Sequence, residues 1–317
     1  MTALLAMASG LPETLSGSSA RSWLVLARTV DYLGTALFVG GTAFLATLWP
    51  AGTHVVRARG VLAVGLVFGL FGTLLAIVLQ GAWIGDLSVG EAAHWDVVAR
   101  VLDTTFGRVW AAKALLWVLA TAVMADLFTR GEQAARSVAW RVGAVVVCAG
   151  LIRTVGLAGH AAERDALVLG IADFVHLTGV SLWIGGLAVL LLGVLPRRRP
   201  EELAAVVPRY SKLAFGSVLA IVAAGTVLSW GLVGSWAKLI GTGYGQLLIL
   251  KIAIFAVVLI AGMASKRWVD RRLDLAVTLR GHAAAVRPFV YSVATETVLV
   301  VFVLLAASFL VTASPGR

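Results

Sequence analysis

Long apolar runs separated by short polar segments dominate the chain. Eight of these runs have about the length that a helix needs to cross the hydrocarbon core of a bilayer, roughly 20 residues. They cover residues 30–49, 60–85, 109–128, 138–159, 174–195, 213–236, 246–265 and 289–313. The runs do not alternate apolar and polar residues as the strands of an outer-membrane barrel do. The pattern therefore predicts an all-α polytopic membrane protein with eight transmembrane helices.

The composition agrees with this class. Hydrophobic residues make up 60% of the 317 residues, charged residues make up 13%, and the mean hydropathy is +0.95. A soluble domain is closer to about half apolar and about a quarter charged. The single cysteine, Cys148, lies inside a predicted helix, so we expect neither a disulfide framework nor a cysteine-based metal motif.

The net charge of +10 is unevenly distributed among the loops. Four alternate loops hold most of the basic residues: Arg57 and Arg59; Arg130, Arg136 and Arg141; Arg197, Arg198, Arg199, Arg209 and Lys212; Lys266, Arg267, Arg271, Arg272, Arg280 and Arg287. Because cytoplasmic loops of membrane proteins are enriched in Lys and Arg, these loops are predicted to be cytoplasmic and both termini extracytoplasmic. The basic charge is thus a topology signal for a protein in a lipid bilayer, and no nucleic-acid partner is expected.

The chain contains a predicted internal repeat. "YLGTALFVGG" (32–41) matches "LTGVSLWIGG" (177–186), "LVFG" (66–69) matches "LAFG" (213–216), and "TFGRVWAAK" (105–113) matches "GYGQLLILK" (243–251). Three helices thus recur in the same order, and helices four and eight complete a 4+4 arrangement. Since each half has an even number of crossings, the repeats are predicted to be parallel, with an axis along the membrane normal.

This repeat divides the chain into four predicted segments. Residues 1–23 form a short extracytoplasmic tail, which lacks the basic region and long apolar core of a signal peptide. Residues 24–137 hold the first-repeat helices one to three, residues 138–165 hold helix four and an outer loop, and residues 166–317 hold the second-repeat helices five to eight.

Within the first pair of matched helices, the alignment places Asp31 on His176. It also places Gly34 on Gly179, Phe38 on Trp183 and Gly41 on Gly186. These positions step by three and four residues, so they share one helical face. Small residues on such a face permit close helix approach, and we expect both faces to lie in the bundle interior.

Ionisable residues inside a membrane usually face the bundle interior or water. The predicted topology places six polar residues in the extracytoplasmic third: Asp31, Arg153, His160, Glu163, Asp173 and His176. Imidazole and carboxylate are ordinary ligands of copper and zinc. Asp173 and His176 lie one helical turn apart, and His160 precedes them by a short loop. The pattern is compatible with a metal site formed by His160, His176, Asp173 and Glu163 with Asp31 opposite, but the spacing alone favours hydrogen-bonded packing roles for the histidines.

Other intramembrane residues carry weaker signals. Lys113 and Lys251 either extend to the interface or pair with acids, and a structural role is favoured. Glu296, near the middle of the last predicted helix, is either paired internally or functional. Arg153 shares a face with Gly156 and His160. Trp183 either walls the site or is a core aromatic residue.

Four motifs together resemble the copper resistance protein D (CopD) family. They are "AGHAAE" (158–163) followed by "DFVHLTGVSLWIGGL" (173–187), "RYSKLAFGSVLAIVAAGTVLSW" (209–230), "TGYGQLLILKIAIFAVVLIAGMASKR" (242–267) and "ETVLVVFVLLAASFLVTASP" (296–315). The resemblance covers a CopD-like core at about residues 150–315 and, through the repeat, residues 25–130 more weakly. His160, His176 and Glu296 fall on family-like positions, whereas Asp31 enters only through the repeat.

The resemblance implies a multi-pass protein of the bacterial inner membrane that takes part in copper uptake or copper tolerance, often with a periplasmic copper carrier of the CopC type. The chain has only four methionines, so no path of soft ligands for Cu(I) can be traced across the membrane. A His and carboxylate site suits Cu(II), or a receiving role at the outer face.

Three functions are therefore compared. The first is a copper transport or resistance protein that accepts copper at its extracytoplasmic face. The second is a redox protein in which His160 and His176 ligate haem b, and the third is a copper sensor or scaffold. The sequence contains no nucleophile elbow, phosphate loop or hydrolytic carboxylate pair, so we do not expect an enzyme.

Overall fold

The computed structural model describes residues 17–157, 166–197, 199–243, 245–246, 248–250, 252–257 and 259–260. Within these residues the secondary structure is helical and contains no strand. Six of the described helices are long and apolar enough to cross a membrane: Ser22–Thr47, Val56–Gly85, Thr105–Arg130, Val138–Leu157, Leu167–Arg197 and Glu201–Gly231. The all-α, multi-pass class predicted from the sequence is therefore confirmed.

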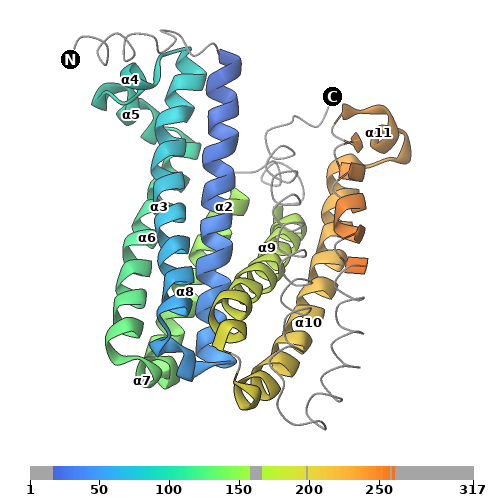
Figure 1. Cartoon of the computed structure of the whole chain (residues 1–317). Helices are drawn as coiled ribbons and strands as arrows, with labels where there is room; N and C mark the ends of the chain where they lie inside the picture. The colour runs from blue at the N-terminus through green and yellow to red at the C-terminus, as the bar shows by residue number, and fades with distance from the viewer. Residues whose placement is uncertain are drawn as a thin grey trace, which may run out of the picture.

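The first half of the chain forms an antiparallel bundle (Figure 1). It contains α2 (Gly17–Thr47), the 3-10 turn η1 (Pro50–His54), α3 (Val56–Gly85), α4 (Val89–Ala92), α5 (Trp95–Leu102), α6 (Thr105–Arg130), α7 (Glu132–Arg136) and α8 (Val138–Leu157). The short helices α4 and α5 lie at the upper end of the bundle in Figure 1, and α7 lies at the lower end.

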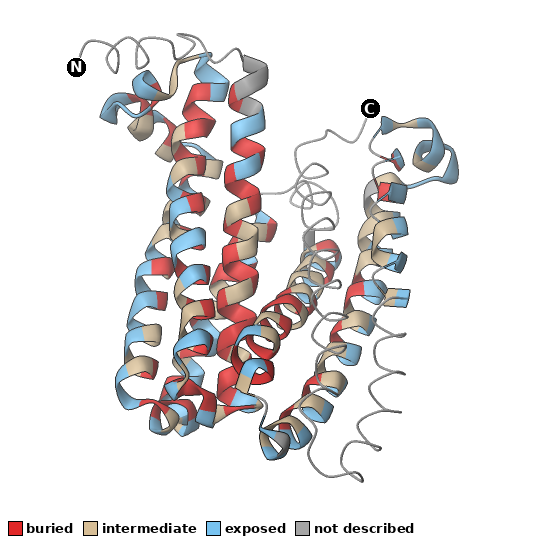
Figure 2. Ribbon diagram, in the orientation of Figure 1, coloured by how far each residue is buried: buried red, intermediate tan, exposed pale blue. Residues whose placement is uncertain are grey.

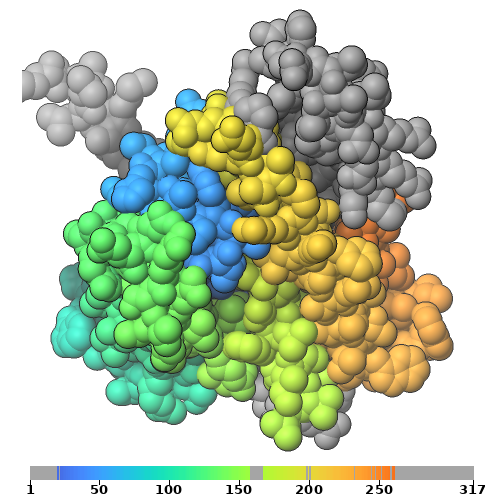
Figure 3. Space-filling view, turned by 90° about the horizontal axis from the view of Figure 1, so that it is seen from below, coloured from blue at the N-terminus to red at the C-terminus, as the bar shows by residue number. Residues whose placement is uncertain are grey.

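The second half crosses this bundle at an angle. It contains α9 (Ala166–Val189), the π-helical turn η3 (Leu190–Val194), the 3-10 turn η4 (Leu195–Arg197), α10 (Pro200–Val233) and α11 (Trp236–Gly241). Helix α9 runs across α2, and α10 lies beyond α9 (Figure 1). Figure 3 shows the lower end face on, with α6 to α8 (green) and α10 (yellow to orange) on opposite sides of the segment that joins α2 to α3 (blue).

Two predicted helices are not tested. The described residues of the seventh, within Leu248–Val257, form a shorter apolar helical stretch, and the eighth, 289–313, lies outside the described residues. The predictions of eight helices and of extracytoplasmic termini therefore stay predictions.

Three helices begin well before the apolar runs indicate, and one of them is α9, which begins at Ala166 rather than at residue 174. Helix α2 begins at Gly17, inside the segment predicted as a tail, and α10 begins at Pro200 rather than at residue 213. Arg209 and Lys212 thus lie on α10 and not in a loop. Pro200 has the fixed φ that suits a first helical turn, and Glu201 stabilises the positive end of the helix dipole. A hydropathy window averages over all faces of a helix. It therefore misses the amphipathic first part of α10, of which only one face is buried.

The core concentrates on the inward faces of the helices. A cluster at the lower end joins residues of α2, α3, α6 to α9 and α10, among them Phe44, Leu62, Leu127, Val189 and Tyr210. Exposed positions line the outer faces of α3, α6 and α10 (Figure 2), and many of them are apolar, such as Phe71, Leu115 and Phe215. Apolar outer faces are what a surrounding lipid phase requires.

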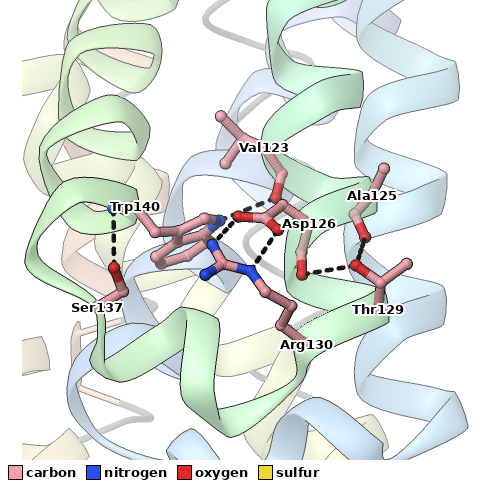
Figure 4. A network of polar contacts seen from close by, with 7 residues as sticks. All are labelled: Val123, Ala125, Asp126, Thr129, Arg130, Ser137 and Trp140. Carbon is pink, nitrogen blue, oxygen red and sulfur yellow. Dashed lines mark hydrogen bonds and ion pairs between the residues drawn. The ribbon is translucent and has the colours of Figure 1, made fainter.

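The lower end also carries basic residues, several of which are paired locally. Arg130 forms an ion pair with Asp126 one turn earlier on α6 (Figure 4). The Trp140 indole of α8 donates to the Val123 carbonyl of α6 at 3.0 Å, and the Ser137 hydroxyl accepts from the Trp140 amide at 3.5 Å. The bond from Trp140 to Val123 ties the end of α6 to the start of α8 across the short helix α7.

Several contacts recur at positions that the repeat alignment matches. An added Cβ on Gly40 would meet the Ser181 carbonyl, and one on Gly185 would meet the Ala36 carbonyl. Matched edge-to-face ring pairs are Phe38–Trp117, with centroids 5.6 Å apart, and Trp183–Phe255, 5.8 Å apart. Matched helix caps join the Thr104 hydroxyl to the Gly107 amide at 3.0 Å and the Thr242 hydroxyl to the Gly245 amide at 3.1 Å. The internal repeat stays a prediction, which these contacts favour.

Candidate metal centre and buried polar network

Helix α9 carries the half-buried side chain of His176 toward α10. Its Nδ1 lies 3.1 Å from the Ile221 carbonyl oxygen. A carbonyl only accepts hydrogen bonds, so Nδ1 donates, which in a neutral ring leaves the lone pair on Nε2. An added Cβ on Gly225, one turn further along α10, would lie 3.4 Å from Nδ1 and Cε1. Helix α10 therefore sets both the tautomer and the position of the ring, as partners of metal-ligating histidines commonly do.

Asp173 lies one turn before His176 and approaches α8. Its Oδ2 occupies the space that a Cβ on Gly156 would fill, so a larger residue there would displace the carboxylate. The same added Cβ would lie 3.6 Å from Arg153 Nη1, and one on Gly170 would lie 3.6 Å from Arg153 Nη2. The Arg153 guanidinium is thus close to the Asp173 carboxylate and can offset its charge.

Four of the predicted site residues lie outside the described residues: His160, Glu163, Lys251 and Glu296. The structure therefore does not place His160 or Glu163 relative to His176. In the part of the chain that the structure describes, no group of three or more His, Cys, Asp and Glu side chains is arranged to hold a metal ion. The metal site stays a prediction.

Asp31 lies in a separate polar network of α2, α3 and α6. Its side chain is 0% exposed and forms an ion pair with Lys113, which is 1% exposed. The Thr73 hydroxyl donates to Asp31 Oδ1 at 2.9 Å, and the Trp117 indole donates to the Thr73 hydroxyl at 3.1 Å. Both carboxylate oxygens of Asp31 are thus engaged by the protein. The sequence predicts that Lys113 either extends to the interface or pairs with an acid. In the structure it pairs with an acid, Asp31.

A second cation, Arg28, lies one turn before Asp31 on α2. Its guanidinium carbon is 5.4 Å from the Phe106 ring centroid and 6.0 Å from that of Trp110, and Nη2 donates to Gln80 Oε1 at 3.5 Å. Arg28 is not among the residues predicted from the sequence, because it precedes the first apolar run. The available signal was its spacing: Arg28 and Asp31 are three residues apart, as are Asp173 and His176.

Trp183 is packed as an aromatic core residue. Its ring contacts that of Phe255 at an interplanar angle of 88°, and its carbonyl accepts a hydrogen bond of 2.7 Å from the Tyr210 hydroxyl. These contacts favour the core alternative over a wall of the metal site.

A groove of about 380 Å³ lies between α9 and α10. Its lining includes Phe174, Gly179, Leu213 and Gly216, together with the buried Ser217 hydroxyl, which has no hydrogen-bond partner in the described structure. Among the described residues, the lining contains no His, Cys, Met or carboxylate side chain. The described lining is therefore mostly apolar.

Comparisons with known proteins identify two matching regions. The model of the copper resistance protein D-like N-terminal domain matches residues 18–171, and the model of copper resistance protein D matches residues 204–310. Asp31, Lys113 and His160 fall in the first region, whereas Asp173 and His176 fall between the two. The first region is thus matched by a model of its own and not only through the repeat.

One curated relative is the copper transport protein CutJ of Bacillus subtilis (strain 168). It is 28% identical over 243 residues, which cover 74% of this chain and 44% of the relative. The chain thus spans less than half the length of this relative. No solved structure matches the chain significantly.

Neither the family matches nor the relative refer to haem, and that alternative has no support. The two matched regions follow each other in order, and together they cover most of an all-helical chain with several membrane-spanning helices. The chain therefore belongs to the copper resistance protein D family.

Proposed function

We propose that this protein is a copper transport or copper resistance protein that accepts copper at its extracytoplasmic face. The observation that carries the proposal is the hydrogen bond from His176 Nδ1 to the Ile221 carbonyl. In the neutral ring, this bond selects the tautomer whose Nε2 lone pair suits a metal ion.

The proposed ligands come from the first half of α9 and from residues 160–163, which precede it in the sequence. His176 and His160 supply imidazole nitrogen, and the carboxylates of Asp173 and Glu163 supply oxygen or orient the histidines. Arg153 offsets the charge of Asp173 when no cation is bound, because the Arg153 guanidinium and the Asp173 carboxylate both lie beside Gly156. Copper is the cargo of this site and not a resident cofactor.

Asp31 and Lys113 receive a structural role in this proposal. A cation at Asp31 would have to displace Lys113 or Thr73, both of which already bind the carboxylate. The pair instead joins α2 to α6 inside the membrane.

The membrane arrangement belongs to the same proposal. We infer eight helices in a 4+4 parallel repeat, extracytoplasmic termini, and a location in the bacterial inner membrane. The matched contacts of the two halves support the repeat. A periplasmic carrier of the CopC type is the proposed copper donor, and the protein is proposed to move or receive copper without catalysing a reaction.

Copper accumulation in cells tests the function. Cells producing the full chain are compared with cells producing His176→Ala or His160→Ala, at equal membrane levels of protein. The expected result is that both variants lose the change in cellular copper that the native chain causes. His94→Ala is the matched control, because His94 is exposed at the start of α5 and makes no side-chain cap. Native accumulation in both site variants would contradict the proposal.

A second measurement separates transport from the alternatives. Copper entry into sealed vesicles that contain the purified chain reports transport directly, whereas a sensor or scaffold binds copper without moving it. Metal analysis and an absorption spectrum of the same preparation distinguish copper from haem, which has a strong Soret band.

A further inference from the structure

An arginine with unmet hydrogen-bond donors is buried near the end of α2 that faces α4 and α5. The Arg28 residue is only 9% exposed, and its Nε has no hydrogen-bond partner in the described structure. The bond from Nη2 to Gln80 Oε1, at 3.5 Å, is at the limit for a hydrogen bond. Since a guanidinium carries five N–H donors, most of its hydrogen-bonding capacity is not used by the described residues.

Aromatic rings hold this guanidinium in place. Phe106 and Trp110 are stacked, with centroids 5.1 Å apart and an interplanar angle of 27°, and Arg28 lies over both rings. Stacking restrains the plane of a guanidinium and leaves its edge to bind an acceptor. The Trp110 indole nitrogen, on a residue that is 2% exposed, also lacks a partner among the described residues. Two neighbouring buried side chains thus present donors without acceptors.

The charges around this point do not balance. Asp31, the acid nearest along α2, is already paired with Lys113, and no ion pair of Arg28 occurs among the described residues. Among the described residues of α2, α3 and α6, Arg28 therefore has no acid that is not already paired with another cation. A buried cation without a counter-ion is costly, so an anion that reached it would be strongly favoured.

We infer that Arg28, oriented by Gln80, Phe106 and Trp110, binds an anionic oxygen group, either a phosphate or a carboxylate. Arginine recognises both groups through paired N–H donors at one edge of its guanidinium. The site lies close to the start of α6, near the predicted extracytoplasmic interface. The ligand is therefore either the headgroup phosphate of a lipid in that leaflet or a soluble oxyanion. This site is separate from the copper site proposed above.

Thermal unfolding of the full chain in a neutral detergent tests the inference. The probes are sodium phosphate, sodium acetate and phosphatidylglycerol, each compared at constant ionic strength. At about ten times the dissociation constant, we expect a saturable rise in the unfolding midpoint of roughly 2–4 °C with at least one probe. Arg28→Gln should abolish this rise. Arg100→Gln, at an exposed arginine paired with Asp96, should retain it.

A second variant keeps the inference testable if Arg28→Gln does not fold. Trp110→Phe removes the unpartnered N–H but keeps an aromatic ring, so it should fold and bind the probe several-fold more weakly. A response only to phosphatidylglycerol identifies a lipid headgroup, and a response to phosphate or acetate identifies a soluble oxyanion. The inference is overturned if the native chain responds to none of the probes. It is also overturned if Arg28→Gln and Trp110→Phe both respond as the native chain does.

Discussion

Gly40 of α2 and Gly185 of α9 touch backbone to backbone. A Cβ added to Gly40 would lie 2.8 Å from the Gly185 Cα, and one added to Gly185 would lie 2.7 Å from the Gly40 Cα. No side chain separates the two helices at this crossing, and the repeat alignment matches these two glycines to each other. Small residues are what allow membrane helices to approach so closely.

Replacing either glycine by alanine should force α2 and α9 apart. We expect Gly40→Ala and Gly185→Ala each to destabilise the protein by about 1–3 kcal/mol, because overpacking in a closed interface displaces backbone. Thermal unfolding in detergent measures the effect. Gly60→Ala is the control, since a Cβ there meets nothing within 4 Å and alanine favours the helix. Equal midpoints for all three variants would refute the close crossing.

The buried pair of Asp31 and Lys113 should depend on both partners. Asp31→Leu or Lys113→Met alone is expected to cost about 3–5 kcal/mol, because each leaves an uncompensated buried charge. The double variant should recover much of this loss, and unfolding free energies of the four proteins measure the coupling between the residues. If the single-variant losses simply add in the double variant, the two residues do not form a pair.

The hydroxyl of Thr73 supports the same pair. Thr73→Val removes the donor to Asp31 and the acceptor of the Trp117 indole, while preserving the shape of the side chain. We expect a loss of about 1–3 kcal/mol, since buried polar groups are left unsatisfied. Thr226→Val on the exposed face of α10, where the hydroxyl bonds only to the Val222 carbonyl, should change stability much less.

The position of His176 should depend on Gly225. Gly225→Val places methyl groups against Nδ1 and Cε1 of the ring and shifts it from the Ile221 carbonyl. If the proposed copper site is correct, copper affinity should fall by about 10–100-fold, as is typical when the support of a ligand is lost. Equilibrium copper binding by purified protein measures it. Gly216→Val on the same helix, where an added Cβ meets nothing within 4 Å, should keep native affinity.

The short helix α4 should respond to acid. Ser88 caps it, and hydrogen bonds from the Ser88 side chain and backbone hold the pKa of the Glu91 carboxyl below its ordinary value of 4.5. A carboxyl whose folded pKa is lowered stabilises the fold above its unfolded pKa, and this contribution is lost as the pH falls through the folded pKa. Hydrogen exchange of α4 should therefore quicken below about pH 4.5. Glu91→Gln should remove that dependence, and unchanged pH dependence in this variant would exclude the capping box as its cause.

The sequence by itself determined the class of the protein and most of its described helices. A run of about 20 apolar residues can cross a bilayer only as a helix, because its backbone groups find no water to bond. This local constraint sufficed to locate α3, α6 and α8 to within a few residues. It failed at the starts of α2, α9 and α10, where the helix extends well beyond the predicted run.

Only the tertiary structure decided which intramembrane charges meet. The sequence suggested Asp31 opposite His176, but the structure pairs Asp31 with Lys113, 82 residues away. It also showed that Arg28 is buried over two aromatic rings. Helix periodicity assigns a residue to a face of its own helix, whereas its partner depends on the rotation and depth of a neighbouring helix. Those quantities are set by close contacts such as Gly40 with Gly185, which arise only when the helices pack together.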